Sequence, residues 1–201
     1  MVMQNAPFYP IVQNPSLGNS GQYSSCTREL FVDLRSGGDR TLVHEMVHAY
    51  INADFRSAPV WIHEGLATLL ADGAVDEHGE VRATESPRAY FHLRYALMGS
   101  DVPSFERMAN AGKVAFYGPG GSWMYATAHH LLFWLLHQKL LQIFYREYRS
   151  HAAEDPTGLA TLERVTGRTL PELRSEWERF IIQQWERNKD RFMRELQEVP
   201  R

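Results

Sequence analysis

The segment Arg40–Ala53 places two histidines and a glutamate inside an amphipathic helical pattern, and this feature most strongly constrains the fold. The histidines are His44 and His48, with Glu45 between them, in the sequence HEMVH. Apolar residues flank them in helical register, namely Leu42, Val43, Met46, Val47, Tyr50 and Ile51. Such a helix is expected to be largely buried, and burying three polar side chains is costly unless something satisfies them. The segment therefore predicts a buried helix that holds a ligand.

His44 and His48 are four residues apart, so on a helix both imidazoles project from the same face, about one turn apart. This separation suits two nitrogen ligands of one tetrahedral Zn²⁺, each at about 2.0–2.1 Å. Glu45 lies about 100° around the helix from His44, where its carboxylate can take a proton from a water on the metal. Five residues thus predict two metal ligands and a general base.

A site of this kind needs a third protein ligand, and two acidic residues compete for that place. Glu64 lies sixteen residues after His48, in a second predicted helix, Trp61–Leu70. An antiparallel pair of helices would bring its carboxylate to the metal. Asp54 lies six residues after His48, but in a continuous helix it would point about 240° away. We therefore expect Glu64 to be the third ligand, with His63 as a weaker alternative.

The remaining sequence predicts an α+β domain that is mainly helical, with a small N-terminal β-sheet. The best strand candidates are Phe8–Val12 and Leu30–Leu34, and residues 72–87 are expected to form a surface loop. Further helices are predicted at 88–98, 105–109, 123–141, 157–166 and 170–196, with Gly167 as a C-cap. We expect one domain, made of a β region at 1–38, metal-binding helices at 39–72 and a helical part at 88–196.

Composition and charge exclude several partner classes. A chain of 201 residues suffices for one well-packed domain. A net charge of -3 without a basic stretch argues against nucleic acid. No apolar run reaches the ~18 residues of a membrane span. Cys26 is the only cysteine, which excludes an internal disulfide and a thiolate zinc site, and it is expected to be half-buried.

The N-terminus lacks a basic start followed by an apolar run, so a signal peptide is not predicted there. A cytoplasmic location is the expectation for the chain as it stands. A secreted or periplasmic location is expected instead if the chain is trimmed from a longer precursor.

The two metal segments together resemble a known family. HEMVH followed by WIHEGLA, at Trp61–Ala67, is similar to the gluzincin clan of zinc metallopeptidases, especially its bacterial peptidase MA-like branch. In that branch a short spacer separates HExxH from a W-x-x-E-G-x-A segment whose glutamate is the third zinc ligand. Tyr125 before an apolar helix, and a tail with a Thr-Gly turn and a tryptophan, also resemble this family. The resemblance covers residues 30–181 and is most specific at the two metal helices.

The resemblance implies a zincin-like fold and one zinc ion held by His44, His48 and Glu64. It implies that Glu45 acts as general base and acid in the hydrolysis of a peptide or protein substrate. It also implies a donor to the oxyanion of the tetrahedral intermediate. The expected donor is Tyr125, and the alternatives are Tyr117, His129 and His130. The strand Leu30–Leu34 resembles the edge strand that lines the cleft in this clan and can pair with an extended substrate.

The sequence also departs from the family. Thr68 stands where thermolysin-like relatives have an aspartate that orients a histidine ligand. The GxMEN-type segment of related aminopeptidases is absent, so endopeptidase action is the expectation. The alternative hypothesis is a catalytically inactive zinc-binding or protein-interaction domain, and a third is a helical structural domain with a chance HExxH. The sequence predicts no particular oligomeric state.

Overall fold

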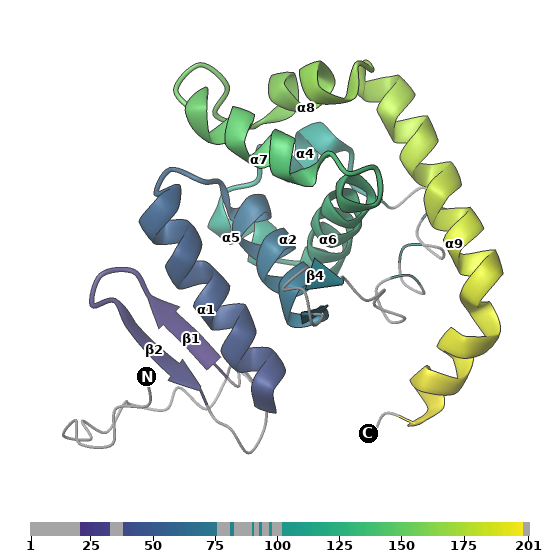
Figure 1. Ribbon diagram of the computed structural model, residues 1–201, viewed down its shortest axis with the longest axis horizontal. Coiled ribbons are helices and arrows are strands. Elements are labelled where there is room, and N and C mark those ends of the chain that lie inside the picture. The colour runs from purple at the N-terminus through teal and green to yellow at the C-terminus, as the bar shows by residue number, and fades with distance from the viewer. Residues whose placement is uncertain are drawn as a thin grey trace.

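A computed structural model describes residues 21–32, 38–75, 81–82, 90, 93, 97 and 102–198, and this part of the chain is mainly helical (Figure 1). Strands β1 (Gly21–Ser24) and β2 (Glu29–Val32) form an antiparallel hairpin in which Gly21 lies opposite Val32. Strand β2 confirms the first three residues of the predicted strand Leu30–Leu34, while Phe8–Val12 lies outside the described residues. Cys26 is exposed in the turn of this hairpin rather than half-buried.

The next two elements are helices α1 (Gly38–Asp54) and α2 (Val60–Ala71), which confirm the two helices predicted around the metal motif. Pro59 precedes α2 with an extended backbone, so it is the N-cap of this helix rather than part of its first turn. Helix α1 contacts both the hairpin and α2. Figure 1 shows the hairpin on the outer side of α1, with α2 on its inner side.

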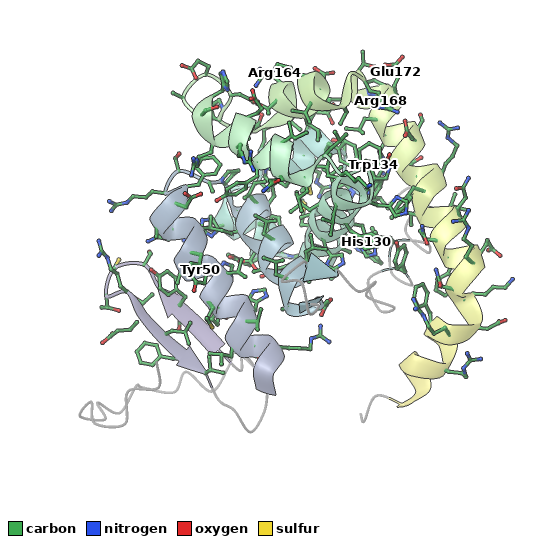
Figure 2. All side chains as sticks on the ribbon, viewed as in Figure 1. Tyr50, His130, Trp134, Arg164, Arg168 and Glu172 are labelled. Carbon is green, nitrogen blue, oxygen red and sulfur yellow. The ribbon has the colours of Figure 1, made fainter. Side chains whose placement is uncertain are left out.

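Helix α6 (Gly121–His137) is the centre of the hydrophobic core. Every residue from Ala126 to Leu135 is buried, because apolar side chains surround this helix on all sides. Its labelled residues His130 and Trp134 lie in the interior of the molecule, whereas Tyr50 on α1 points outward with 68% of its surface exposed (Figure 2). The short helices α4 (Phe105–Ala109) and α5 (Lys113–Tyr117) precede α6.

Gly65 allows α2 to approach α6 closely. A Cβ atom at this position would lie 2.7 Å from the Leu132 side chain and 3.2 Å from the backbone of Ala128. We predict that Gly65→Ala lowers the free energy of unfolding by about 1–3 kcal/mol, because overpacking a filled core forces side chains and backbone to shift. Without this close contact, alanine would stabilise a helix interior by about 1 kcal/mol relative to glycine.

Gly112→Ala is the matched control for urea unfolding of the Gly65 variant, because nothing lies within 4 Å of a Cβ atom at residue 112. An increase in stability on Gly65→Ala would contradict this prediction, because it would show that a methyl group fits between α2 and α6.

The C-terminal helices are α7 (Leu141–Ser150), α8 (Leu159–Thr166) and α9 (Leu170–Glu198). The prediction of one helix over 123–141 is wrong at its end, because α6 stops at His137 and α7 begins four residues later. Lys139 in this connection has a left-handed backbone (φ 60°). Figure 1 shows α9 along the side of the molecule opposite the β1–β2 hairpin.

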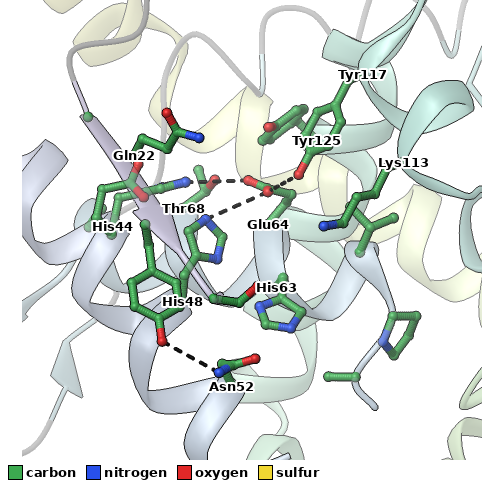
Figure 3. Close-up of a pocket in the computed structure, with 18 of the residues that line it drawn as sticks. Gln22, His44, His48, Asn52, His63, Glu64, Thr68, Lys113, Tyr117 and Tyr125 are labelled. Atoms are coloured by element: carbon green, nitrogen blue, oxygen red, sulfur yellow. Dashed lines mark hydrogen bonds and ion pairs between the residues drawn. The ribbon is translucent and has the colours of Figure 1, made fainter. Parts of the chain in front are cut away.

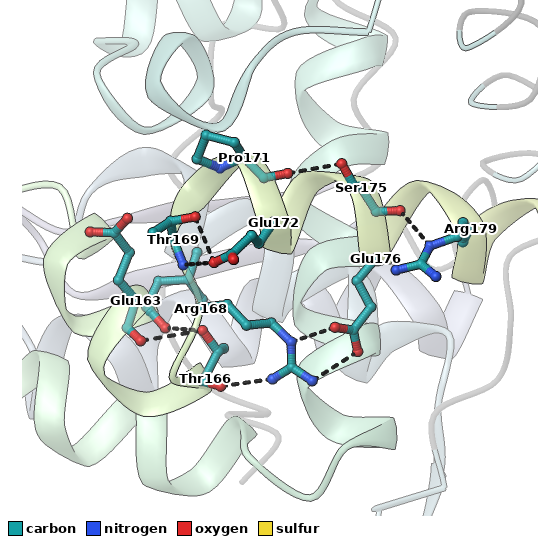
Figure 4. A network of polar contacts seen from close by, with 10 residues as sticks. Glu163, Thr166, Arg168, Thr169, Pro171, Glu172, Ser175, Glu176 and Arg179 are labelled. Carbon is teal, nitrogen blue, oxygen red and sulfur yellow. Dashed lines mark hydrogen bonds and ion pairs between the residues drawn. The ribbon is translucent and has the colours of Figure 1, made fainter.

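The junction of α8 and α9 is held by capping and an ion pair (Figure 4). Gly167 ends α8 with a φ of 66°, which confirms it as the predicted C-cap. Glu172 accepts hydrogen bonds from the backbone N–H and the hydroxyl of Thr169, at 2.9 and 2.7 Å. Arg168 pairs with Glu176 through two nitrogens. These contacts fix the direction in which α9 leaves α8.

The predicted surface loop at residues 72–87 contains two short paired strands, β3 (Ala74–Val75) and β4 (Val81–Arg82). Within the predicted helix 88–98, the structure describes only residues 90, 93 and 97, each of them helical. None of the helices in the described residues is long and apolar enough to cross a membrane.

Candidate metal centre

Three predicted ligands meet where α1 faces α2. His44 and His48 come from α1 and Glu64 from α2, and one ligand atom of each lies within 4.8 Å of the others (Figure 3). The helical spacing of four residues places the two imidazole rings 4.8 Å apart and nearly perpendicular. The antiparallel packing of the two helices supplies the carboxylate. This group could therefore hold a metal ion.

The distances within the group fit that function. His44 Nε2 lies 3.3 Å from Glu64 Oε2, and His48 Nε2 lies 3.6 Å from Glu64 Oε1. Ligands held tetrahedrally at about 2.0–2.1 Å from a metal are about 3.3 Å from one another. The exposed fractions of the side chains are 23% for His44, 14% for His48 and 5% for Glu64. A carboxylate this deeply buried needs compensation by a positive charge or by hydrogen bonds.

Glu64 is only partly satisfied by its neighbours in the described part of the chain. Its Oε1 accepts a hydrogen bond of 2.5 Å from the hydroxyl of Tyr117. Its Oε2 is buried and forms no hydrogen bond within the described residues, although His44 Nε2 lies within ion-pair distance. An acceptor left in this state beside two imidazole nitrogens is the arrangement that a bound cation would complete.

The protonation states of the group also favour metal binding. Burial lowers the pKa of His48 to about 4, so this imidazole is neutral at physiological pH and its lone pair is available. Burial raises the pKa of Glu64, but His44, His48 and the Tyr117 hydroxyl outweigh it and leave the pKa below its ordinary value. The group therefore offers a neutral imidazole at His48 and an ionised carboxylate at Glu64.

Glu45 lies beside the group, where α1 meets β1. This residue is 8% exposed and lines the same cleft. Burial raises the pKa of this carboxyl, while the charge of His44 and a backbone hydrogen bond from Tyr23 on β1 lower it, and the net pKa is raised. A carboxylate with a raised pKa accepts a proton more readily, which suits a general base.

Two tyrosines border the group on the side of α5 and α6. Tyr117 is half exposed and its ring lies 6.1 Å from that of Tyr125, and both line the cleft. Burial, reinforced by the charge of Glu64, raises the pKa of both hydroxyls above the ordinary value, so both remain protonated donors. The structure thus brings the expected residue Tyr125 and the alternative Tyr117 to the same site.

The two weaker candidates for the third ligand have different partners. The carboxylate of Asp54 accepts hydrogen bonds from Tyr145 (3.1 Å) and Arg149, both on α7, and does not join the group. His63 lines the cleft with its ring 5.6 Å from that of His48, but it is not part of the group either.

No protein-family model matches this chain, and no curated protein or solved structure matches it. What the chain does is therefore inferred from the site itself.

The group lies in a cleft of about 1150 Å³ between β1, α1, α2 and the segment 110–117. The strand that borders this cleft is β1, with Gly21, Gln22 and Tyr23 among the lining residues, and the described residues of β2 are not among them. The prediction that Leu30–Leu34 lines the cleft is therefore wrong for Leu30–Val32, and residues 33 and 34 lie outside the described residues. Gly21 is pressed against α1, since a Cβ there would lie 2.5 Å from Thr41 Cγ2, and this close approach puts β1 between β2 and the cleft.

The end of the cleft beyond Glu64, toward the last turn of α2, is lined by Thr68 and Asp72. The side chain of Asp72 is only 6% exposed, and Arg40 of α1 pairs with it. Burial raises the pKa of Asp72, although the charges of Arg40 and His44 lower it in part. Sequence reasoning missed this ion pair, because it joins residues 32 positions apart in neighbouring helices.

His129 and His130, which the sequence also offers as oxyanion donors, lie outside the cleft. Both are fully buried in α6 and neither is among the cleft-lining residues. His130 Nδ1 lies 3.1 Å from the carbonyl oxygen of Ala126, and the ring packs edge-on against Tyr90. Within the described residues, neither ring nitrogen of His129 has a hydrogen-bond partner. The two histidines are part of the core rather than of the site.

The burial of His129 predicts acid-sensitive stability. Burial lowers its pKa to about 4 in the folded protein, while the unfolded value is near 6.5. The unfolded state therefore binds the proton first, and stability present above about pH 6.5 is lost as the pH falls toward 4. We expect the metal-free protein to lose about 2 kcal/mol through this residue between about pH 7 and pH 5.

Urea unfolding at both pH values measures this loss of stability. His129→Leu should remove the part of the pH dependence that comes from this histidine. His137→Gln, at an exposed position on the same helix, is the control and should keep the full pH dependence. An unchanged dependence in the His129 variant would contradict the assignment.

Proposed function

We propose that this protein is a zinc-dependent metallopeptidase of the gluzincin type. The observation that carries the proposal is the group of His44, His48 and Glu64, whose ligand atoms lie within 4.8 Å of one another, with Glu45 beside them in the same cleft. Two imidazoles and one carboxylate are the ligand set that zinc uses when it keeps a fourth position for water or substrate. Magnesium, calcium and manganese prefer oxygen ligands and therefore fit this set less well.

A zinc ion in this place supplies a Lewis acid that polarises a carbonyl group and acidifies water. The protein residues supply the remaining steps. Glu45 accepts the proton of the attacking water and passes it to the leaving amine, and its raised pKa supports this exchange. Tyr117 and Tyr125, both protonated, are the available donors for the negative charge that develops on the carbonyl oxygen.

The shape of the cleft supports a peptide substrate. Strand β1 forms one wall beside Glu45, and a strand at the border of a cleft can bind an extended peptide through its backbone. Residues 110–113 and Tyr117 form the opposite wall, so an extended chain can pass between them across the metal ligands. An extended chain held in this way would present an internal peptide bond to the ligands.

One observation favours the alternative of a zinc-binding domain without catalysis. Thr68, one turn after Glu64, lines the cleft where thermolysin-like enzymes have an aspartate. A hydroxyl is a weaker partner than a carboxylate for orienting a histidine ligand, and such outer contacts contribute to metal affinity and activity. This alternative predicts zinc binding with no turnover.

The test is a zinc titration followed by a hydrolysis assay. The purified protein is expected to bind one zinc ion per chain and to hydrolyse members of a quenched fluorescent peptide library. A chelator should abolish the hydrolysis and added zinc should restore it. Zinc binding without cleavage would support the inactive domain, and the absence of stoichiometric zinc would overturn both hypotheses.

A further inference from the structure

The two ends of the cleft differ in how their charges are compensated. At the end formed by the start of α1 and the end of α2, the cation Arg40 is paired with the buried carboxylate of Asp72. That ion pair leaves little net charge for a ligand. The opposite end, at the turn between α1 and α2, has a different composition.

At that opposite end the cleft is lined by Arg56, His63 and Lys113. Arg56 and Lys113 are exposed, and neither forms an ion pair with a carboxylate in the described part of the chain. Asp54 is the acidic residue closest in sequence to Arg56, but its carboxylate is held by Arg149 and Tyr145 of α7. Two uncompensated cations therefore remain on the cleft wall.

Lys113 is directed at the site. Figure 3 shows its side chain extending from α5 toward the pocket that Glu64 and His63 also line. Lys113 and Arg56 are therefore two exposed cationic side chains that line this end of the cleft.

We propose that Lys113, assisted by Arg56, binds a carboxylate of the substrate next to the bond that is cleaved. An ammonium and a guanidinium form charge-assisted hydrogen bonds with carboxylates. The inference rests on the proposed peptidase function and specifies its substrate class. The carboxylate belongs either to an aspartate or glutamate side chain or to the C-terminus of the peptide.

The experiment compares matched peptides on the zinc-loaded protein. Once the cleaved bond is mapped in an uncharged fluorogenic peptide, glutamate and glutamine are placed in turn at the positions around it. Each peptide is made with a free and with an amidated C-terminus. We expect one glutamate peptide, or the free C-terminus, to have a kcat/KM at least about tenfold above its uncharged partner, as one charge-assisted hydrogen bond allows. A preference for glutamate over glutamine identifies a side-chain carboxylate, and a preference for the free over the amidated C-terminus identifies the terminal carboxylate.

Lys113→Gln is expected to bring this ratio close to one, and Arg56→Gln to lower it less. Lys139→Gln is the matched control, because Lys139 is an exposed lysine between α6 and α7 and is not among the cleft-lining residues. Its ratio should equal that of the parent protein. A ratio of one in the parent, or a ratio that survives Lys113→Gln, would overturn the inference.

Binding of the same peptides to zinc-loaded Glu45→Gln protein, followed by fluorescence anisotropy, measures carboxylate recognition without turnover. This measurement distinguishes failure of the carboxylate inference from failure of the proposed peptidase function. Turnover without any preference for a carboxylate overturns the inference and leaves the peptidase function in place. Preferential binding of the acidic peptide by a protein that cleaves nothing overturns the peptidase function and leaves Lys113 as a carboxylate-binding residue.

Discussion

Replacement of Glu64 by alanine is expected to weaken zinc binding by about 10²- to 10³-fold. Zinc held by four protein ligands gains about 10–16 kcal/mol, so the loss of one ligand costs roughly 3 kcal/mol. Glu64 also joins the two helices across the site, since its oxygens lie 3.3 and 3.6 Å from His44 and His48. The variant should retain two histidines on α1 and bind zinc weakly through them. Competition with a chromophoric chelator measures the affinity.

Asp54→Ala is the informative control for this variant. Sequence spacing offers Asp54 as the competing ligand, but the structure gives its carboxylate to Tyr145 and Arg149. Zinc affinity should therefore be unchanged in the Asp54 variant. Loss of zinc on Asp54→Ala, with Glu64→Ala unaffected, would reverse the assignment of the third ligand.

Glu45→Gln is expected to lower kcat by about 10²- to 10⁴-fold while leaving zinc affinity unchanged, because a general base contributes to proton transfer and not to ligation. Glutamine keeps the size of the side chain and the possibility of a hydrogen bond from the backbone of Tyr23. Peptide hydrolysis and zinc stoichiometry are measured on the same preparation, so that inactivity from lost metal is recognised.

Glu154→Gln, at an exposed position after α7, is the control for the removal of one negative charge. It should retain the activity of the parent. Full activity of Glu45→Gln would place the base elsewhere in the cleft and would remove Glu45 from the mechanism.

The helices that carry the metal ligands are predictable from sequence because their apolar residues repeat at helical spacing. The same periodicity misplaces the end of α6. Apolar residues continue through Leu135, Leu140 and Leu141, and neither glycine nor proline marks the break, which falls at Lys139 with a φ of 60°. Helix α5 is missed since five residues between two glycines show too little periodicity to reveal a helix.

The residues of the site likewise include some that the sequence predicts and some that it does not. His44 and His48 follow from their spacing within one helix, and Glu64 from a second helix close behind it. Tyr117 and Lys113 reach the site only because α5 packs against α2 and α6, 49 or more positions after Glu64 in the chain. Contacts of this range depend on tertiary packing, which local patterns do not encode. Tertiary packing also decides that β1, and not the predicted strand β2, borders the cleft.

The close contact of Gly65 with α6 has a consequence for anyone who wishes to transplant this site. Residues 38–72 contain all three candidate ligands and Glu45 on one helical hairpin, which makes them attractive as a portable module. In the intact protein, however, the residue that follows Glu64 is pressed against Leu132 and Ala128, so the far helix sets the rotation of α2 about its axis. A graft of the hairpin alone would contain the ligands but not the surface of α6 that orients Glu64. A working transplant would have to include α6 as well.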